Sequence, residues 1–406
     1  MAFRPACNPT QAGKCMRRPK CIHPFLSPRV GHRSLHARAT EYLQPHDPDW
    51  TESQRIIRES IAKICSKFPD EYWLNAEESR RYPLDFQAAL AKDGWLGICM
   101  PAEYGGSQLG ISEAAVMMQT ISESGAGMAG ASSVHMNIFG LEPVVKFGNA
   151  EQKRRFLIPL VQGRERACFG VTEPNTGHDT LKLRSMATRN CEHYILKGSK
   201  IWISAAQHAE KILILVRTSP LDKVTKPSQG LSLFYTDLDR SQVDVSEIPK
   251  MGRAAVDSNT LFFENWKVPA ADMIGEENNG FKMIIHDMNA ERILIAAEAL
   301  GARLRGDATR GKIRKRATAA QLMVYQAARM YDAGYTSGEY ANAAKYLAAE
   351  AACERAVMSH GWMGYAREYH VERYLREAFI PRIAPVSREM VCSYIGERVL
   401  GLPKSY

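Results

Sequence analysis

The chain has 406 residues, of which 45% are hydrophobic and 24% are charged, as in ordinary soluble globular proteins. This length allows a large core divided among two or three domains. No stretch reaches the roughly 18 uninterrupted apolar residues that a membrane helix needs, so we expect no membrane insertion. The nine cysteines form no CxxC pair and no Cys/His cluster, so the sequence predicts no metal site.

The formal net charge of +9 comes almost entirely from the N-terminus. Residues 1–40 contain eight Lys or Arg and no Asp or Glu, and the remainder has 45 basic against 44 acidic residues. An Arg-rich, acid-free start without an apolar stretch predicts a mitochondrial presequence, and hence a place in the mitochondrial matrix. A disordered basic tail and a wrongly assigned start are the alternatives. Because the body is nearly neutral, no nucleic-acid partner is expected.

Three segments of different pattern follow the leader. Residues 41–165 show helical periodicity, and one helix begins after Thr51. Residues 166–278 show strand patterns, and Gly198-Ser199 between two of them predicts a hairpin. Residues 279–406 are helical again. The prediction is a mainly α protein with a central antiparallel β-domain. The expected strands cover 194–197, 200–203, 212–216, 231–236, 243–248 and 261–268.

One glutamate lies on an apolar helical face. The residues three, four and seven positions from Glu291 on this face are Ile284, Met288, Leu294 and Ile295. Burial among apolar neighbours raises the pKa of a carboxyl group, which suits a general base near neutral pH. A buried structural glutamate paired with a distant cation is the alternative.

Two other segments have the chemistry of a binding site. Residues 169–179 form a polar, turn-rich loop whose amides and hydroxyls suit an anion or a flat heterocycle. Trp202 and Ser204 share one face of a strand and pair an aromatic ring with a hydrogen-bonding group. Either segment alone is more often purely structural.

Together these segments resemble the acyl-CoA dehydrogenase family. The matching stretches are Val171-Thr-Glu-Pro-Asn-Thr-Gly-His-Asp, Gly198-Ser-Lys-Ile-Trp-Ile-Ser, and Gly280-Phe followed by Asn289-Ala-Glu-Arg-Ile. The resemblance runs from about residue 50 to the C-terminus. It implies a helical N-terminal domain, a β-barrel middle domain and a C-terminal helical bundle, with boundaries near 165 and 278.

The resemblance implies an FAD cofactor, an acyl-CoA substrate and an electron-transfer flavoprotein as partner, in a homotetramer or homodimer. The positions it assigns to FAD are Phe169, Val171, Thr172, Gly177, His178, Trp202, Ile203 and Ser204. His178, Asn289 and Arg292 are implied to contact the acyl-CoA.

The resemblance also assigns the reaction. Members of the isovaleryl and long-chain type carry the base on the helix after the β-domain, where this chain has Glu291. Other members carry it in a C-terminal loop, at a position that falls here on Pro385. Glu291 is thus implied to remove the α-proton while the β-hydrogen leaves as hydride to the flavin. The product is a trans-2-enoyl-CoA, in fatty-acid or branched-chain amino-acid catabolism. Since Pro385 has no N–H, Val386 or a shifted register of the loop is expected to supply the thioester's backbone donor.

Residues 302–320 are the atypical segment, short and strongly basic compared with the family. A solvated charged loop and a nucleic-acid or nuclear-targeting patch are two interpretations. A truncated or wrongly spliced chain is the third, and it would weaken FAD binding and assembly. This third interpretation keeps a rival function open, in which the chain is a non-catalytic homologue that retains the fold as an interaction partner.

Overall fold

The computed structural model describes residues 50–138, 140–308, 314–350 and 354–404. By its contacts the chain divides into two units, Met1–His46 and Asp47–Tyr406, and the account below concerns the second. The presequence expected at 1–40 lies outside the described residues. In the described part of the chain, no helix is both long and apolar enough to cross a membrane.

The first part of the unit is helical. The helix predicted after Thr51 begins there with a capping box: the Gln54 amide donates to the Thr51 hydroxyl, and the Thr51 amide donates to the Gln54 side chain, both at 3.2 Å. Between α5 and α6 the chain turns at Gly125, whose φ of 114° favours glycine. The helices are α2 (Glu52–Cys65), α3 (Asp70–Glu78), α4 (Leu84–Lys92), α5 (Ile111–Ile121), α6 (Gly127–Ile138), α7 (Glu142–Phe147) and α8 (Ala150–Val161).

The middle part is an eight-stranded sheet, joined in the order β6-β7-β3-β2-β4-β5-β8 with β1 paired to β4. The strands are β1 (Ala167–Gly170), β2 (Met186–Asn190), β3 (His193–Ser204), β4 (Lys211–Arg217), β5 (Leu231–Asp237), β6 (Val243–Glu247), β7 (Ser258–Pro269) and β8 (Met273–Ile274). The expected antiparallel arrangement is only partly right, because β1 and β2 both run parallel to β4. The sheet is therefore mixed.

The hairpin predicted at Gly198-Ser199 is wrong. Residues 193–204 form one long strand, β3, and both of its halves pair with β7. Gly198 has a φ of 152° and lies at a shift in the pairing register, so the glycine bends the strand without reversing it. A second shift lies between Lys200 and Ile203.

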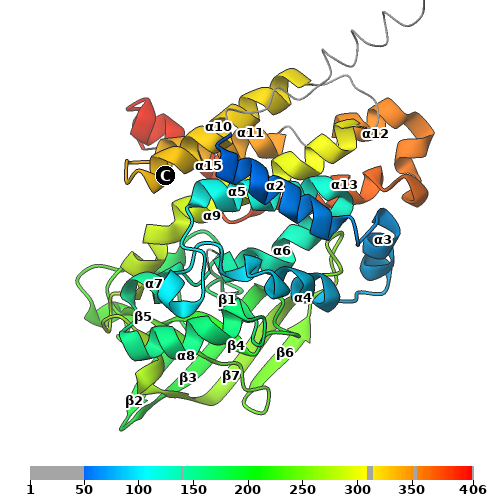
Figure 1. Cartoon of the computed structure of the whole chain (residues 1–406). Helices are drawn as coiled ribbons and strands as arrows, with labels where there is room; N and C mark the ends of the chain where they lie inside the picture. The colour runs from blue at the N-terminus through cyan, green and yellow to red at the C-terminus, as the bar shows by residue number, and fades with distance from the viewer. Residues whose placement is uncertain (1–49, 139, 309–313, 351–353, 405–406) are drawn as a thin grey trace, which may run out of the picture. The chain divides into compact units, whose positions relative to one another are not determined.

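The last part of the unit is again helical, and its longest helix, α9, is central. Figure 1 shows α9 running beside α5, α10 and α11, on the side of the body away from β2. The helices are α9 (Gly280–Ala308), α10 (Arg314–Asp332), α11 (Gly338–Glu350), α12 (Glu354–His360), α13 (Val371–Glu377), α14 (Ile380–Ile383) and α15 (Arg388–Tyr394).

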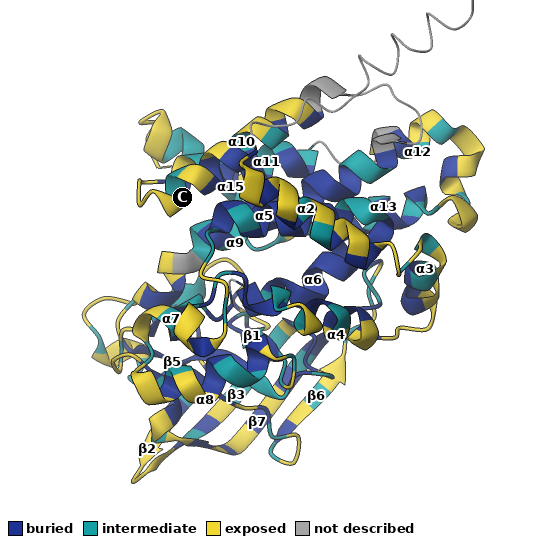
Figure 2. Ribbon diagram, in the orientation of Figure 1, coloured by how far each residue is buried: buried dark blue, intermediate teal, exposed yellow. Residues whose placement is uncertain are grey.

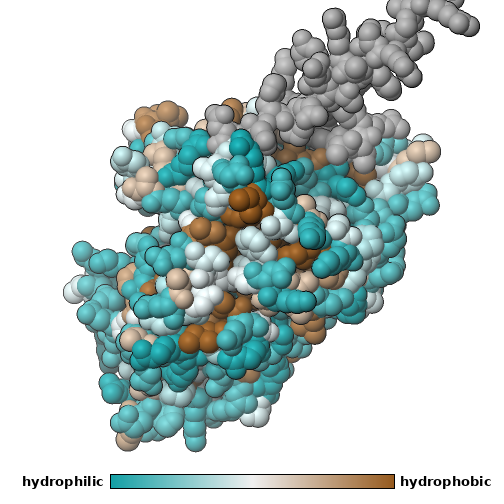
Figure 3. All heavy atoms as spheres, viewed as in Figure 1, coloured by the Kyte–Doolittle hydropathy of each residue, from teal (hydrophilic) through white to brown (hydrophobic). Residues whose placement is uncertain are grey.

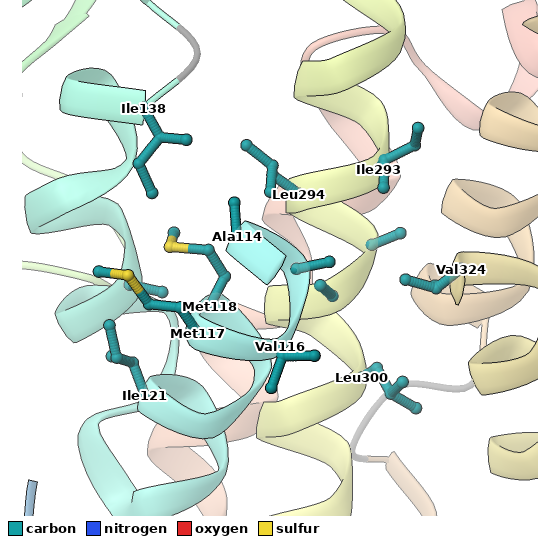
Figure 4. Packing of buried hydrophobic residues seen from close by; sticks show 14 of the residues in the cluster. Ala114, Val116, Met117, Met118, Ile121, Ile138, Ile293, Leu294, Leu300 and Val324 are labelled. Atoms are coloured by element: carbon teal, nitrogen blue, oxygen red, sulfur yellow. The ribbon is translucent and has the colours of Figure 1, made fainter. Parts of the chain in front are cut away.

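The helical core forms where α5, α6 and α9 meet. In Figure 4, Met117 and Met118 of α5, Ile138 of α6 and Leu294 of α9 point toward one another. Figure 2 shows these three helices largely buried, whereas α2 exposes its outer face. On the face drawn in Figure 3 the surface is mostly hydrophilic, with hydrophobic patches near its centre. The site described below is built around this rigid helical layer.

The interpretation of 302–320 as a solvated loop is wrong for its beginning. Residues 302–308 continue α9, Arg303 is buried, and Arg305 donates to the Asp70 carboxylate of α3. These two arginines are thus part of the packed helical layer and do not belong to a solvated loop. Residues 309–313 lie outside the described residues.

Candidate active site

A buried ion pair fixes the loop that follows β1. The Lys200 ammonium, on β3, donates to the Glu173 carboxylate at 2.9 Å and to the carbonyls of Val171 and Leu215. Glu173 also accepts the amides of Arg184 and Ser185. Burial alone would raise the pKa of Glu173, but Lys200 and these bonds outweigh it, so the pKa lies below its ordinary value. The ion pair and its hydrogen bonds therefore hold the loop against β3.

The same loop lies directly beside the predicted aromatic plate. The Ile201 amide donates to the Thr172 carbonyl at 2.9 Å, which brings Thr172 next to the end of β3. Trp202 has a φ of 63° and a side chain that is 56% exposed, while the neighbouring Ile203 is buried. An exposed indole on a rigid strand is a surface on which a flat ring can stack. Of the other positions assigned to FAD, Phe169 is partly buried on β1 and Val171 is buried.

The residues present fit an FAD. Thr176 is buried, and its hydroxyl oxygen has no hydrogen-bond partner among the described residues. Gly177 is exposed, with open space where a side chain would stand, so a phosphate group can approach the backbone. Thr172, Thr176 and Gly177 would hold the polar parts of the cofactor, and Trp202 its ring system. Within the described residues no cluster of His, Cys, Asp and Glu is arranged to hold a metal ion.

Glu291 lies on α9 and is partly buried. It makes no hydrogen bond or ion pair with any residue that the structure describes. Burial raises the pKa of its carboxyl group to about 7, and the nearby His135, Arg292 and Lys345 side chains only partly oppose this shift. A carboxylate with this pKa and no fixed partner can accept a proton near neutral pH.

The C-terminal loop connects Glu291 to the FAD loop. Lys345, a buried lysine of α11 that lies in the electric field of Glu291, donates to the Val386 carbonyl. The next amide, that of Ser387, donates to Nε2 of His178 at 3.1 Å. The Val386 amide itself has no hydrogen-bond partner among the described residues. His178, Val386 and Glu291 therefore belong to one continuous site.

Asn289 and Arg292, predicted to contact the substrate, lie one turn apart on α9. The Arg292 guanidinium donates to the Asn289 amide oxygen at 3.0 Å. Burial lowers the pKa of Arg292, and the charge of Glu291 opposes this effect. The two side chains thus form a polar pair beside the carboxylate.

A second connection passes through a loop of the β-domain. Arg253 donates to the hydroxyls of Ser132 on α6 and Ser204 on β3, both at 3.0 Å. The Glu77 carboxylate of α3 holds this loop through the amides of Ala254 and Ala255. Ser204, assigned to FAD, is therefore tied to the helical layer that carries Glu291.

Sequence reasoning missed several groups of this site: Arg253, Lys345, Thr176, and the contact between His135 of α6 and Glu298 of α9. Glu298 interrupts an otherwise apolar helical stretch, which is a readable signal of a buried polar group, whereas His135 lies among serines and an asparagine and gives no such signal. Their pairing joins positions 163 residues apart and follows only from the packing of α6 on α9.

Comparison with known proteins agrees with this arrangement. Three family models match, for the N-terminal, middle and C-terminal domains of acyl-CoA dehydrogenases, over residues 51–164, 168–266 and 309–400. An acyl-CoA dehydrogenase of Bacillus subtilis is 30% identical over 379 residues, covering 86% of this chain and 99% of that protein.

Solved structures give the same result. Butyryl-CoA dehydrogenase from Megasphaera elsdenii is 26% identical with a TM-score of 0.80, covering 87% of this chain and 100% of that one. A chain solved in work on the electron transferring flavoprotein of Acidaminococcus fermentans is 26% identical with a TM-score of 0.81, covering 87% of this chain and 99% of that one. The chain therefore belongs to the acyl-CoA dehydrogenase family of FAD-dependent oxidoreductases.

Proposed function

We propose that the protein oxidises an acyl-CoA thioester to its trans-2-enoyl-CoA, with Glu291 as the base that removes the α-proton. The observation that carries this proposal is the state of Glu291: partly buried, without a fixed partner, and with a pKa raised to about 7. A base is most effective when its pKa lies near the working pH, because it is then ionised and still strong.

The Val386 amide and the Asn289–Arg292 pair assist the removal of the α-proton. Negative charge develops on the thioester oxygen as the α-proton leaves, and a hydrogen-bond donor there stabilises it. The Val386 amide is such a donor, since Lys345 and His178 hold the peptide group that follows it. Asn289 and Arg292 orient the thioester end from α9.

The cofactor is held by the β-domain side of the site. FAD, when bound, takes up the hydride from the β-carbon. Trp202 offers the ring system a flat exposed surface, Ser204 lies at the end of the same strand, and Thr176 offers a hydroxyl without another partner.

The electron acceptor and the assembly are part of the same proposal. We infer that an electron-transfer flavoprotein reoxidises the enzyme, which the similarity to a chain studied with such a protein supports. A second copy of the chain would cover the exposed hydrophobic side chains after α12, where Trp362 is 90% and Tyr365 is 78% exposed. A mitochondrial location, suggested by the basic residues 1–40, belongs to the proposal too.

The test is an anaerobic titration of the purified, FAD-loaded protein with acyl-CoA thioesters. The yellow absorbance is expected to bleach with at least one saturated acyl-CoA, and mass spectrometry is expected to find the enoyl-CoA. A protein that carries FAD and bleaches with no thioester from four to sixteen carbons, straight or branched, would refute the proposed reaction. A protein that takes up no FAD would favour a non-catalytic homologue.

A further inference from the structure

Glu298 lies on the same face of α9 as Glu291, two helical turns further on. Seven residues separate them, which is about 10 Å along the helix axis. The Glu298 side chain is fully buried, and one of its oxygens contacts Nδ1 of His135 on α6. The field of both groups reaches Glu291, since His135 lowers and Glu298 raises the pKa of that carboxyl group.

The start of α9 is closed to an acyl group by packing. Toward the start of the helix, Met283 and Ile284 are buried in the core shared with the β-domain. A Cβ at Gly280 would stand 2.8 Å from the backbone nitrogen of Leu233, so strand β5 closes that end. An acyl group with its α-carbon at Glu291 that followed α9 would therefore extend toward Glu298.

Apolar Leu294 and Ile295 come first on this face of α9, and charged or polar groups follow them. Arg253 lies between Ser132 and Ser204, and Glu298 is the strongest of the anions that act on it. Ser132 precedes His135 by one turn of α6. A long hydrocarbon tail would have to lie against a carboxylate, an imidazole and a guanidinium, and displacing their polar contacts is costly.

One carboxylate oxygen of Glu298 is available to accept a hydrogen bond. Its Oε2 atom is buried and has no hydrogen-bond partner among the described residues. Leaving a buried acceptor unpaired is costly, and more so for a charged group. A donor at the far end of the substrate would remove this cost, whereas a methyl group would not.

We propose that Glu298, positioned by His135, determines the acyl specificity of the enzyme and selects a short acyl group with a hydrogen-bond donor, a hydroxyl or an ammonium, beyond its β-carbon. This inference rests on the proposed dehydrogenation and names its substrate class. Selectivity arises because only such a substrate satisfies Glu298 when it enters.

The experiment compares four thioesters on the FAD-loaded enzyme: butyryl-CoA, 4-hydroxybutyryl-CoA, 4-aminobutyryl-CoA and octanoyl-CoA. At least one of the two polar substrates is expected to exceed both others in kcat/KM by ten-fold or more. A preference for octanoyl-CoA overturns the proposal, and so does a preference for butyryl-CoA over both polar substrates.

Variants assign the selectivity to the named residues. The double variant Glu298→Leu/His135→Leu is expected to shift the ratio of octanoyl-CoA to the preferred polar substrate by at least ten-fold toward octanoyl-CoA. Thr120→Val, which replaces a buried polar side chain of α5, is expected to leave the ratio unchanged. An unchanged ratio in a folded, FAD-loaded double variant overturns the assignment.

A single substitution identifies the donor and is mild enough to fold. Glu298→Gln keeps an acceptor oxygen but removes the charge, so a preference for the ammonium substrate is lost and one for the hydroxyl substrate is retained. Binding of the four enoyl-CoA products to Glu291→Gln, measured by calorimetry, is expected to follow the same order. This binding order tests the specificity without turnover. A failure to turn over any of the thioesters would count against the proposed reaction and not against the specificity.

Discussion

The Ser387 amide donates a hydrogen bond to Nε2 of His178 at 3.1 Å, and this contact joins two loops that lie 209 residues apart. One loop belongs to the β-domain and is assigned to FAD, and the other contains Val386. The contact aligns the Val386 amide with the cofactor side of the site.

Replacing His178 by Ala should therefore impair catalysis without unfolding the protein. The side chain is exposed, so the free energy of unfolding should change by about 0.5 kcal/mol or less. Loss of one hydrogen bond of about 1 kcal/mol predicts a fall in kcat/KM of about five-fold. His178→Gln, whose amide oxygen can accept the same bond, should recover part of the loss. A His178→Ala enzyme with unaltered kcat/KM would show that the two loops need no alignment.

Glu291→Gln tests the base directly. The variant should keep its fold and its FAD, because Glu291 makes no hydrogen bond or ion pair with the described residues. A positioned general base contributes about 100-fold to 10,000-fold, so kcat should fall within or beyond this range. Glu59→Gln on the outer face of α2 is the matched control and should retain full activity. An active Glu291→Gln enzyme would mean that another carboxylate is the base.

The pH dependence of turnover should report the pKa of Glu291. The base works only when ionised, so kcat/KM should fall about ten-fold per pH unit below a pH of about 7. Lys345, which faces Glu291 from α11, lowers the pKa of that carboxyl group. Lys345→Met should therefore move the midpoint of the acid limb upward.

The raised pKa of Glu291 also affects the stability of the folded protein. The pKa of Glu291 is raised above its ordinary value of 4.5, so the folded state binds more protons than the unfolded state between these two values. The free energy of unfolding should then decrease as pH rises from about 4.5 to 7. Glu291→Gln removes this penalty, so it should raise Tm relative to the parent at pH 8 but not at pH 4. A Tm difference that is independent of pH would contradict the raised pKa.

Lys200 and Glu173 should be among the most sensitive positions of the β-domain. Their side chains are 0% and 7% exposed, and removing one partner of a buried ion pair costs about 3–5 kcal/mol. Lys200→Met should show this loss in urea unfolding, together with a lower FAD content. Lys197→Met on the same strand breaks an exposed pair, with side chains 69% and 58% exposed, and should cost about 1 kcal/mol or less. Equal losses in the two variants would contradict the structural role of the buried pair.

How much of this molecule is readable from sequence depends on the range of the interactions. The start of α2 follows from Thr51 and Gln54, which lie within one turn, and the apolar face around Glu291 follows from helical spacing. A bend within a strand and a hairpin turn can both use a glycine with positive φ, as Gly198 has. Only the pairing of both halves of β3 with β7 distinguishes the bend from the turn. The continuation of α9 through 302–308 does not follow from that segment alone, because Arg305 is satisfied by Asp70, which is remote in sequence.

In the site, too, some residues can be recognised from their own segment and others only from distant contacts. Glu291, Trp202 and the loop at 171–178 are conspicuous within their own segments, as an acid among apolar residues, an aromatic on a strand, and a run of turn residues. Lys345 and Arg253 are ordinary in their segments and acquire their roles from contacts with Val386 and Ser204. Contacts of this kind depend on how three layers pack, which periodicity does not encode.

Trp202→Ala should separate cofactor binding from folding. Because the indole is 56% exposed, its removal should change the free energy of unfolding of the FAD-free protein by less than about 1 kcal/mol. If the indole stacks on the flavin, the loss of about 1–2 kcal/mol of aromatic contact should weaken FAD binding by about ten-fold, measured by the quenching of flavin fluorescence. Phe262→Ala on the paired strand β7 removes an aromatic side chain of 55% exposure and should leave the affinity for FAD unchanged. Equal affinities in Trp202→Ala and Phe262→Ala would place the flavin elsewhere, because Trp202 is the one of the two that lies beside the Thr172 loop.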